Sequence, residues 1–506
     1  MFEWSKVNLP FRFLTMTISP AIAISMKMYI TTLKSVIQQH FISSKPTRKK
    51  YNERQGRSIG TIILLFAFLH HVNVQGQSKD LSKKEVQAVV SALADSVKYY
   101  YVEAGTARDI YAQLNKSLRE GVYEGVGNSE ALAALLSKQL ISLSNDKHFG
   151  VDFAATTSGH LQRRMPGTYN HLAPYNYYFN KMEILPGNIG LLEIGQFVPT
   201  DYTGQLIVAA MNFFANSDAL IIDLRNCIGG DPRTVLQLAG YFFKEPVLFE
   251  ISHNRGANSS EEFWTTKTDF QGTEKGKIAF SNKNEKGIKV DYSKLETMPM
   301  YVLTSNATFS AGEVMAHGLH TRQRAKSVGD TTGRGGNGIR PFVLPHGFVA
   351  FIPFAQMVSP INGKGFQLTG VVPDITASPA KALDDAYTTA LRQLIDGAAG
   401  EASKNRLNWE MRLYLLRRQG GYKADVQQYA GLYGDREVIQ EDGDLYYQRE
   451  GGTKKQLQPL TEKYFLLDRQ TVVEFSSNGQ SIIVHQMNGS ENRFDRTNKT
   501  SKLQKQ

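Results

Sequence analysis

The sequence predicts an α/β fold, preceded by a helical N-terminal domain and followed by a small antiparallel β domain. Three patterns support this prediction: apolar residues at helical spacing over 82–97 and 129–143, strands alternating with helices between 189 and 395, and glycine-containing turn dipeptides between 442 and 489. Alternating strands and helices are typical of a sheet covered by helices. The predicted domains are 1–76 (basic extension plus signal peptide), 78–160 (helical), 161–398 (α/β core) and 405–500 (antiparallel β).

Length and charge indicate a protein of more than one domain without a nucleic-acid partner. A chain of 506 residues is too long for one domain, and its hydrophobic fraction of 41% is sufficient for packed cores. The net charge is +11, but residues 1–57 hold ten Lys or Arg and two Asp or Glu, a net charge of +8. Because the remainder is nearly balanced, it offers no basic surface for a phosphate backbone, and we expect no nucleic-acid partner.

The N-terminal segment has the pattern of an export signal. A basic stretch ends at Arg57 and is followed by an apolar run over 59–69. This run is short for a membrane span and matches a signal-peptide core, with Val74-Gln75-Gly76 at the cleavage site and Gln77 as the mature start. We expect a periplasmic or extracellular protein. A short membrane anchor is the alternative, so any membrane contact is expected only through this segment.

The helical N-terminal domain is predicted from two segments. Ser82 and Glu85 form a capping box before the apolar positions of the first segment, and Ser129 opens the second. A polar break at 145–148 ends the second helix and leads into a strand-like stretch. At the other end of the chain, four glycine-containing dipeptides predict tight hairpin turns, and we find no chemistry there.

The α/β core is predicted from apolar runs of strand length separated by helical segments. The predicted strands are 189–194, 219–225, 298–304, 325–329, 347–352 and 370–374. The predicted helices are 204–215, a helix that begins after 231, a helix that begins at 310, 380–395 and 409–419.

Two of the strand–loop–helix units carry chemistry. Ser310 follows a strand and starts a helix, so its hydroxyl is expected at the ligand-binding edge of the sheet and near a helix N-terminus. Gly229 and Gly230 follow another strand, and together with Ala311 they could present backbone N–H groups to the oxyanion of a tetrahedral intermediate. The alternatives are that Ser310 and Glu313 merely form a capping box and that the glycines form an ordinary turn.

A serine nucleophile needs a base, and histidine is the usual choice. The candidate histidines are His148, His160, His171, His253, His317, His320 and His346. We favour His148, which lies in the break between the helical region and the core. Cys227 is the single cysteine, so the chain has no internal disulfide and no cysteine-based zinc site. A buried thiol is the favoured interpretation, with a catalytic thiol as the alternative, and no metal or cofactor is expected.

Four segments in order, 219–230, 304–313, 328–336 and 370–374, resemble the tail-specific or C-terminal-processing serine peptidases. The branch shared with the tricorn core and interphotoreceptor retinoid-binding protein is the more similar one. The resemblance implies a crotonase-like (ClpP/crotonase) core, Ser310 as nucleophile, and Gly229, Gly230 and Ala311 as oxyanion donors. It also implies a polypeptide substrate, in an extended or unfolded segment.

The two branches of the family that this sequence resembles use different residues as the base. One branch uses a lysine about 25 residues after the serine, where this chain has Gly335, whereas the tricorn-like branch uses a histidine from a segment resembling 145–148. His148 is therefore expected as the base, with Lys326 and Lys364 as weaker candidates. Where relatives carry a glutamate this chain has Gln367, which can orient imidazole but lacks a charge, and Glu313 is a possible substitute acid.

Three functions follow from these residues. The first is an exported serine endopeptidase. The second is a non-catalytic relative that binds peptide or an apolar ligand and has lost proton transfer, which Gly335 and Gln367 motivate. The third is ester hydrolysis at the same serine, since residues 308–312 loosely match a nucleophile elbow.

Overall fold

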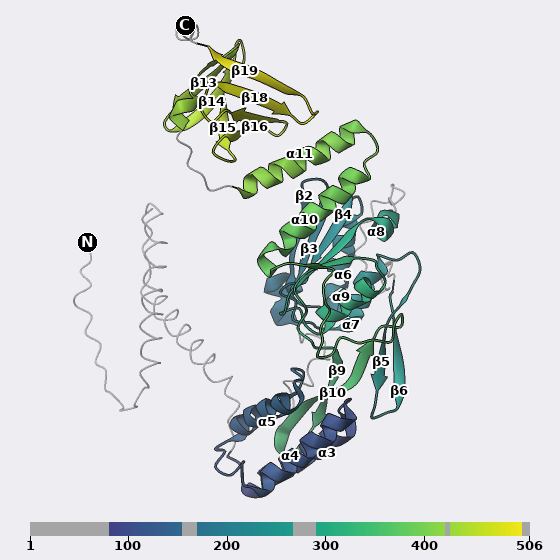
Figure 1. Ribbon diagram of the computed structural model, residues 1–506. Coiled ribbons are helices and arrows are strands. Elements are labelled where there is room, and N and C mark those ends of the chain that lie inside the picture. Colours follow the sequence, from purple (N-terminus) through teal and green to yellow (C-terminus); the bar gives the residue numbers. More distant parts are fainter. Residues whose placement is uncertain (1–79, 154–168, 267–289, 420–425, 498–506) are drawn as a thin grey trace, which may run out of the picture. The chain divides into compact units, whose positions relative to one another are not determined.

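The computed structural model describes residues 80–153, 169–266, 290–419 and 426–497 (Figure 1). The predicted signal segment and its basic extension lie outside these residues. Among the helices within them, none is both long and apolar enough to cross a membrane.

The helical N-terminal region is confirmed. It contains α3 (Lys83–Tyr100), α4 (Ala104–Arg119) and α5 (Ser129–Ser144), followed by β1 (Gly150–Phe153). The predicted capping box is present, because Glu85 N–H donates to the Ser82 hydroxyl at 3.3 Å and Ser82 N–H donates to Glu85 Oε2 at 2.9 Å. The apolar core of this region also takes in residues of the distant strand β10 (Phe348–Val358), including Phe348, Ala350 and Ile352.

The predicted α/β core forms a largely parallel sheet in the order β11-β8-β7-β4-β3-β2. Its strands are β2 (Phe179–Leu185), β3 (Ile189–Ile194), β4 (Ala219–Asp223), β7 (Met300–Thr304), β8 (Lys326–Gly329) and β11 (Ile375–Thr376). Its helices are α6 (Thr200–Phe214), α7 (Pro232–Gly240), α8 (Ser293–Thr297), α9 (Ala311–Thr321) and α10 (Pro379–Asp396).

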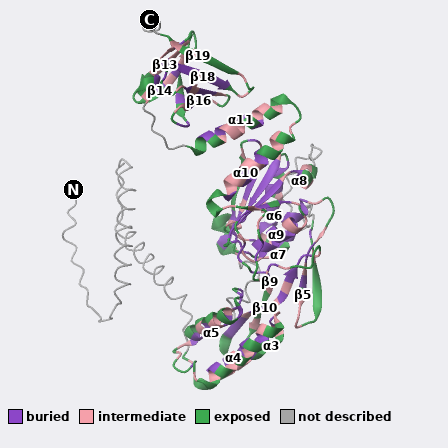
Figure 2. Cartoon of the chain, viewed as in Figure 1, coloured by how far each residue is buried: buried purple, intermediate pink, exposed green. Residues whose placement is uncertain are grey.

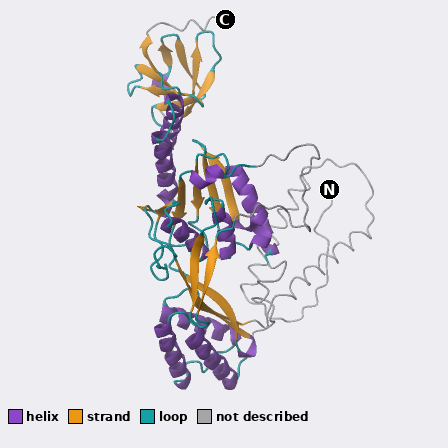
Figure 3. Ribbon diagram, turned by 90° about the vertical axis from the view of Figure 1, so that its right-hand side faces the viewer, coloured by secondary structure: helices purple, strands orange, loops and turns teal. Residues whose placement is uncertain are grey.

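Helices cover both faces of this sheet (Figure 3). One apolar cluster joins the sheet to α6, α7 and α9, and a second joins the opposite face to α10. Every residue of β4 and β7 is therefore buried (Figure 2), which explains why both strands are nearly continuous apolar runs in the sequence. The parallel pairing of β4 with β7 brings the carboxyl ends of these two strands to the same sheet edge.

A second sheet links the helical region to the core. Its path is β1-β10-β5-β6, with β9 also paired to β10, and its other strands are β5 (Leu248–Asn254), β6 (Ser259–Trp264) and β9 (Asn337–Val343). The first half of β10 pairs with β1, and its last residues pair with β5. This long strand thereby fixes the segment before β1 against the core.

The predicted strand at 370–374 is wrong. Strand β11 begins at Ile375, directly after the predicted segment. The segment itself is held by a backbone bond from Thr332 N–H to the Val371 carbonyl at 3.2 Å and by side chains. Val371 N–H donates to the Thr332 hydroxyl at 2.7 Å, and the Asp374 carboxylate accepts from Ser327 N–H at 2.7 Å. Pro373 supplies no N–H for a ladder, which explains why an apolar run failed to form a strand here.

The C-terminal domain is a closed antiparallel barrel, β12–β19, in sequence order. Its strands are β12 (Gly431–Tyr433), β13 (Arg436–Glu441), β14 (Asp444–Arg449), β15 (Lys455–Pro459), β16 (Tyr464–Asp468), β17 (Thr471–Phe475), β18 (Ser481–Gln486) and β19 (Glu491–Thr497). Helix α11 (Glu401–Arg418) precedes it. Leu407 of α11 packs in the α10 cluster, whereas Trp409 and Leu413 pack with Leu460 and Val472 of the barrel domain.

Candidate active site

Ser310 lies at a strained strand-to-helix turn between β7 and α9. Its φ of 52° and ψ of −119° are unusual for a residue with a side chain. Such a conformation at this kind of turn exposes a nucleophilic hydroxyl at the edge of a sheet. Backbone contacts hold the turn in place, since Phe309 N–H donates to the Cys227 carbonyl at 2.9 Å and the Thr308 hydroxyl donates to the Leu224 carbonyl at 2.7 Å.

The glycine loop lies directly against this turn. Gly229 and Gly230 have φ values of 103° and 135°, which disfavour any other residue. A Cβ at Gly229 would lie 2.7 Å from Ser310 Cβ, and a Cβ at Gly230 would lie 2.1 Å from the Phe197 carbonyl oxygen. Both glycines are therefore required by close backbone approach, and the predicted loop and the serine are brought together.

Two backbone N–H groups are available next to Ser310. The Gly230 and Ala311 N–H groups donate to no acceptor within the described part of the chain, whereas Gly229 N–H lies against the Cys227 sulfur. Ala311 N–H also lies in the first turn of α9, where N–H groups have no partner in the helix. The pair Gly230 and Ala311 is thus the better match to an oxyanion hole.

Cys227 lies under the same loop and is fully buried. Burial raises the pKa of its thiol to about 12, so the thiolate is absent near neutral pH. A Cβ at Gly312 would lie 3.1 Å from its sulfur, so the thiol packs closely against α9. These observations favour the packing role over a nucleophilic one.

His148 is positioned by the break after α5. Asn145 ends that helix in the left-handed conformation, and the next residues turn back toward the core. The imidazole packs on the ring of Phe309, with the ring centroids 4.5 Å apart. Since Phe309 immediately precedes Ser310, this contact brings the predicted base to the predicted nucleophile from 162 residues away in the chain.

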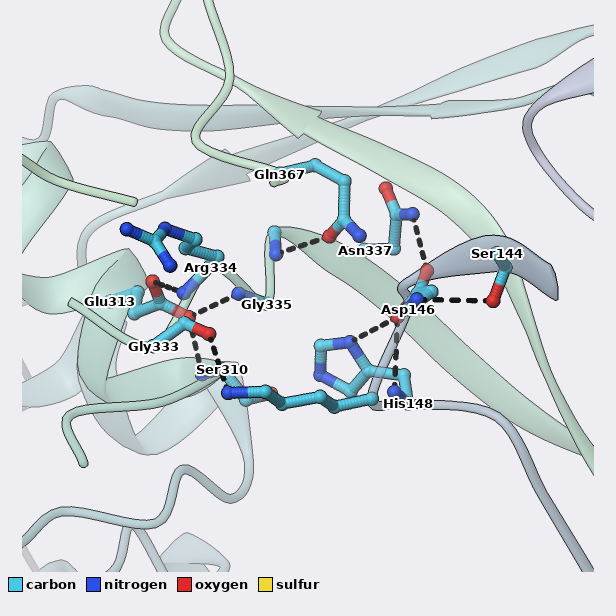
Figure 4. A network of polar contacts seen from close by, with 12 residues as sticks. Ser144, Asp146, His148, Ser310, Glu313, Gly333, Arg334, Gly335, Asn337 and Gln367 are labelled. Carbon is cyan, nitrogen blue, oxygen red and sulfur yellow. Dashed lines mark hydrogen bonds and ion pairs between the residues drawn. The ribbon is translucent and has the colours of Figure 1, made fainter. Parts of the chain in front are cut away.

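Asp146 is the carboxylate beside this imidazole (Figure 4). Its Oδ1 lies 3.3 Å from His148 Nδ1 and accepts His148 N–H at 3.0 Å, and its Oδ2 accepts from Asn337 Nδ2 at 2.9 Å. Asp146 is completely buried, and hydrogen bonds and charge from His148 hold its pKa below the ordinary value although burial acts in the opposite direction. Asp146 was not predicted as a site residue, although it lies within the segment 145–148 that carries the predicted base.

The imidazole has unused hydrogen-bonding capacity. His148 is 8% exposed, and neither ring nitrogen meets a hydrogen-bond partner among the residues described, because the Nδ1 contact to Asp146 is poorly aligned. Catalytic hydrogen bonds are often long before substrate binds. An unpaired Nε2, on an imidazole that packs against the residue before Ser310, is suited to accept a proton.

Glu313, the possible substitute acid, bonds to the serine turn and the following loop and not to His148. Its buried carboxylate accepts hydrogen bonds from Ser310 N–H at 3.1 Å, Gly335 N–H at 2.7 Å and Arg334 N–H at 2.8 Å (Figure 4). It also accepts from the Thr332 hydroxyl at 2.5 Å. Burial is the largest influence and raises its pKa. Glu313 thus joins the serine turn to the 332–335 loop.

Gln367 also bonds elsewhere. Its Oε1 accepts from Gly336 N–H at 2.6 Å, and Figure 4 shows no contact between it and His148. Lys326 and Lys364 are exposed and absent from this network. His317 pairs with Glu250 at 2.8 Å, away from the serine. The described ranges contain no cluster of three His, Cys, Asp or Glu residues that could hold a metal ion.

Gly335 packs against both rings of the site. A Cβ at this position would lie 2.2 Å from Phe309 Cε2 and 2.7 Å from His148 Cε1. A lysine at 335 and a histidine at 148 therefore cannot coexist in this arrangement. Because His148 occupies the space that a side chain at position 335 would need, only glycine fits there. This explains why the chain has Gly335 where one branch of the family that it resembles has a lysine.

Two family profiles match this chain. The profile of Peptidase family S41 matches residues 188–377, which include Ser310 and both glycines. The profile of the N-terminal domain of Peptidase_S41 in eukaryotic IRBP matches residues 81–179, which include His148.

Similar solved structures include mature CPAF complexed with lactacystin (12% identity, 64% of this chain and 99% of that chain, TM-score 0.43). A lipoprotein from Streptococcus agalactiae is similar at 14% identity, covering 63% of this chain and 99% of that one, with a TM-score of 0.39. The photosystem II D1 C-terminal processing protease is similar at 14% identity, covering 58% and 93%, with a TM-score of 0.37.

Proposed function

Because this chain belongs to peptidase family S41, a family of serine peptidases, we propose that it is an endopeptidase that hydrolyses peptide bonds through an acyl-enzyme on Ser310. The observation that carries this proposal is the packing of the His148 ring against Phe309, the residue before a serine in a strained turn. The family resemblance supports a crotonase-like core and an extended or unfolded polypeptide substrate. Superposing the β3-β4-β7-β8 layer on the corresponding sheet of crotonases would test whether the core is crotonase-like.

The proposed mechanism follows from the positions of these groups. Ser310 Oγ attacks the peptide carbonyl carbon while its proton moves to His148 Nε2, and the carbonyl oxygen becomes an oxyanion that accepts from the Gly230 and Ala311 N–H groups. When the tetrahedral intermediate collapses, the imidazolium gives its proton to the departing amine. Water then attacks the acyl-enzyme by the same route and releases the acid product.

Asp146 orients the imidazole and stabilises its cationic form in this mechanism. It lies next to Nδ1, so Nε2 is the nitrogen left for the serine. The carboxylate keeps its charge around neutral pH, because its pKa lies below the ordinary value for aspartate. The alternative of a non-catalytic relative rested on Gly335 and Gln367, and the contacts of Gly335 remove the first of these reasons.

We expect a fluorophosphonate probe to label the wild-type protein and not Ser310→Ala, because the probe reacts only with an activated serine. Labelling would be followed by gel fluorescence, with the modified peptide identified by mass spectrometry. Ser490→Ala, a change in a hairpin of the barrel, is the control and should label like wild type. If folded wild-type protein is not labelled, the non-catalytic alternative is favoured instead.

We also propose that the protein is exported, on the basis of the basic segment and the apolar run at 59–69. Expression in a bacterial host should yield a protein in the periplasm or medium whose N-terminus begins near Gln77, as read by N-terminal sequencing. A full-length N-terminus on protein that stays in the membrane fraction would indicate the anchor instead.

A further inference from the structure

Four tyrosines, three of them just before β2, form two pairs of neighbouring rings. The short helix η3 (Asn170–Tyr178) contributes Tyr175, Tyr177 and Tyr178, and α6 contributes Tyr202. We call these four residues the tyrosine surface. The rings of Tyr175 and Tyr178 are nearly parallel with centroids 6.3 Å apart, and those of Tyr177 and Tyr202 are 5.6 Å apart. Tyr175 is 64% exposed, whereas Tyr177, Tyr178 and Tyr202 are half-buried, so the group is partly open to solvent.

The backbone beneath these rings is strained. Asn176, Tyr177 and Tyr178 have φ values of 48°, 50° and 64°, so three consecutive non-glycine residues adopt the left-handed conformation. L-residues seldom do this even singly, and strain of this kind concentrates at binding and catalytic sites. Asn176 Nδ2 donates to the Phe179 carbonyl at 3.1 Å, which helps to hold the turn. The strained backbone carries Tyr177 and Tyr178, one from each of the two ring pairs.

The strained turn is bonded directly to the strand beside the oxyanion loop. Gly195 N–H donates to the Tyr178 carbonyl at 2.9 Å, and Ile228 N–H donates to the Gly195 carbonyl at 3.0 Å. A Cβ at Gly195 would lie 3.1 Å from Tyr178 Cδ1, so the ring covers this glycine. Ile228 immediately precedes Gly229 and is 60% exposed, so its apolar side chain is open to solvent beside the glycine loop.

We propose that the tyrosine surface, together with Ile228, binds an aromatic side chain of the extended polypeptide substrate close to the bond that is cleaved. This inference rests on the proposed function and adds a substrate preference to it. Tyrosine rings bind aromatic groups through edge and face contacts, and they lose little conformational entropy on binding. Two hydrogen bonds and one glycine separate Tyr178 from the Gly229-Gly230 loop, so a substrate residue near the reacting carbonyl can reach both.

The test measures binding without turnover, in Ser310→Ala protein. Fluorescein-labelled peptides of about ten residues, with a single central Phe, Ala or Asp in identical Gly/Ser flanks, would be titrated by fluorescence anisotropy. We expect the Phe peptide to bind about tenfold more tightly than the Ala peptide, the size of effect typical of one well-packed aromatic anchor. Adding Tyr175→Ala or Tyr177→Ala should abolish this preference.

Tyr99→Ala is the matched control, because Tyr99 is 60% exposed on the helical region and lies outside the proposed surface. It should keep the preference. Equal affinities for the Phe and Ala peptides, tightest binding of the Asp peptide, or an unchanged preference in folded Tyr175→Ala would each overturn the proposal. Because Tyr175 is largely exposed, this variant should fold even if Tyr177→Ala does not.

The two proposals can fail separately. Probe labelling of wild-type Ser310 reports on the peptidase mechanism, whereas the binding titration needs no reactive serine. An unlabelled protein that still prefers the Phe peptide would retain the tyrosine surface and lose the peptidase. A labelled protein without this preference would support the peptidase mechanism and rule out the tyrosine surface as a binding site for aromatic side chains.

Discussion

Replacing Asp146 with asparagine should lower kcat for peptide hydrolysis by about 10³- to 10⁴-fold while leaving the fold intact. The loss is expected because the imidazolium formed at His148 would no longer face a negative charge, and its tautomer would no longer be set. The fold should survive, because Asn337 Oδ1 has no hydrogen-bond partner within the described chain and can turn to accept from the new amide. Steady-state kinetics on a quenched peptide substrate, with thermal unfolding, measures both.

Gln367→Ala is the informative comparison, since Gln367 was the sequence-based partner of His148. If Asp146 is the orienting group, Gln367→Ala should affect kcat far less than Asp146→Asn, because its recorded bond is to Gly336 N–H. An equal or larger loss in Gln367→Ala would return that role to Gln367. In addition, the pH profile of kcat should change in Asp146→Asn, whereas a purely structural defect would lower the rate equally at all pH values.

Substituting Gly335 should lower kcat/KM by at least about 10²-fold, for alanine as well as for lysine. Even a single Cβ would overlap the rings of Phe309 and His148, and the least costly relaxation is to rotate one of those rings. Either rotation moves the base away from Ser310, and misplacing a catalytic group by about 1 Å can cost about 100-fold. Peptide hydrolysis and probe labelling would be compared at equal folded concentrations.

Gly338→Ala provides the control, because a Cβ there meets Ala355 Cβ at 3.7 Å, an ordinary contact, and it should be nearly neutral. The lysine variant makes a further distinction. Gly335→Lys places a lysine where the other branch of the resemblance has its base. If Gly335→Lys stayed active, and remained so after His148→Ala, a lysine-based mechanism would operate in this fold and the assignment of His148 would fail.

Much of the fold was predictable because it depends on local patterns. The apolar runs at 189–194, 219–225 and 298–304 correspond to β3, β4 and β7. Ser82 caps α3 as predicted, and α5 begins at Ser129 as predicted, although its cap is Asn128. The glycine turn dipeptides corresponded to a barrel. The segment 370–374 was mispredicted because side-chain hydrogen bonds, which periodicity does not record, replaced a ladder.

The proposed nucleophile and the proposed oxyanion loop could be predicted from the amino-acid order alone, because both follow parallel strands whose carboxyl ends must meet. The residues that surround the His148 imidazole could not be predicted in this way. Asp146 bonds to Asn337, 191 residues later, and Gly335 reaches His148 only because β10 fixes the helical region against the core. Such long-range contacts arise from packing, so the identity of the acid and the need for a glycine at 335 emerge only in three dimensions.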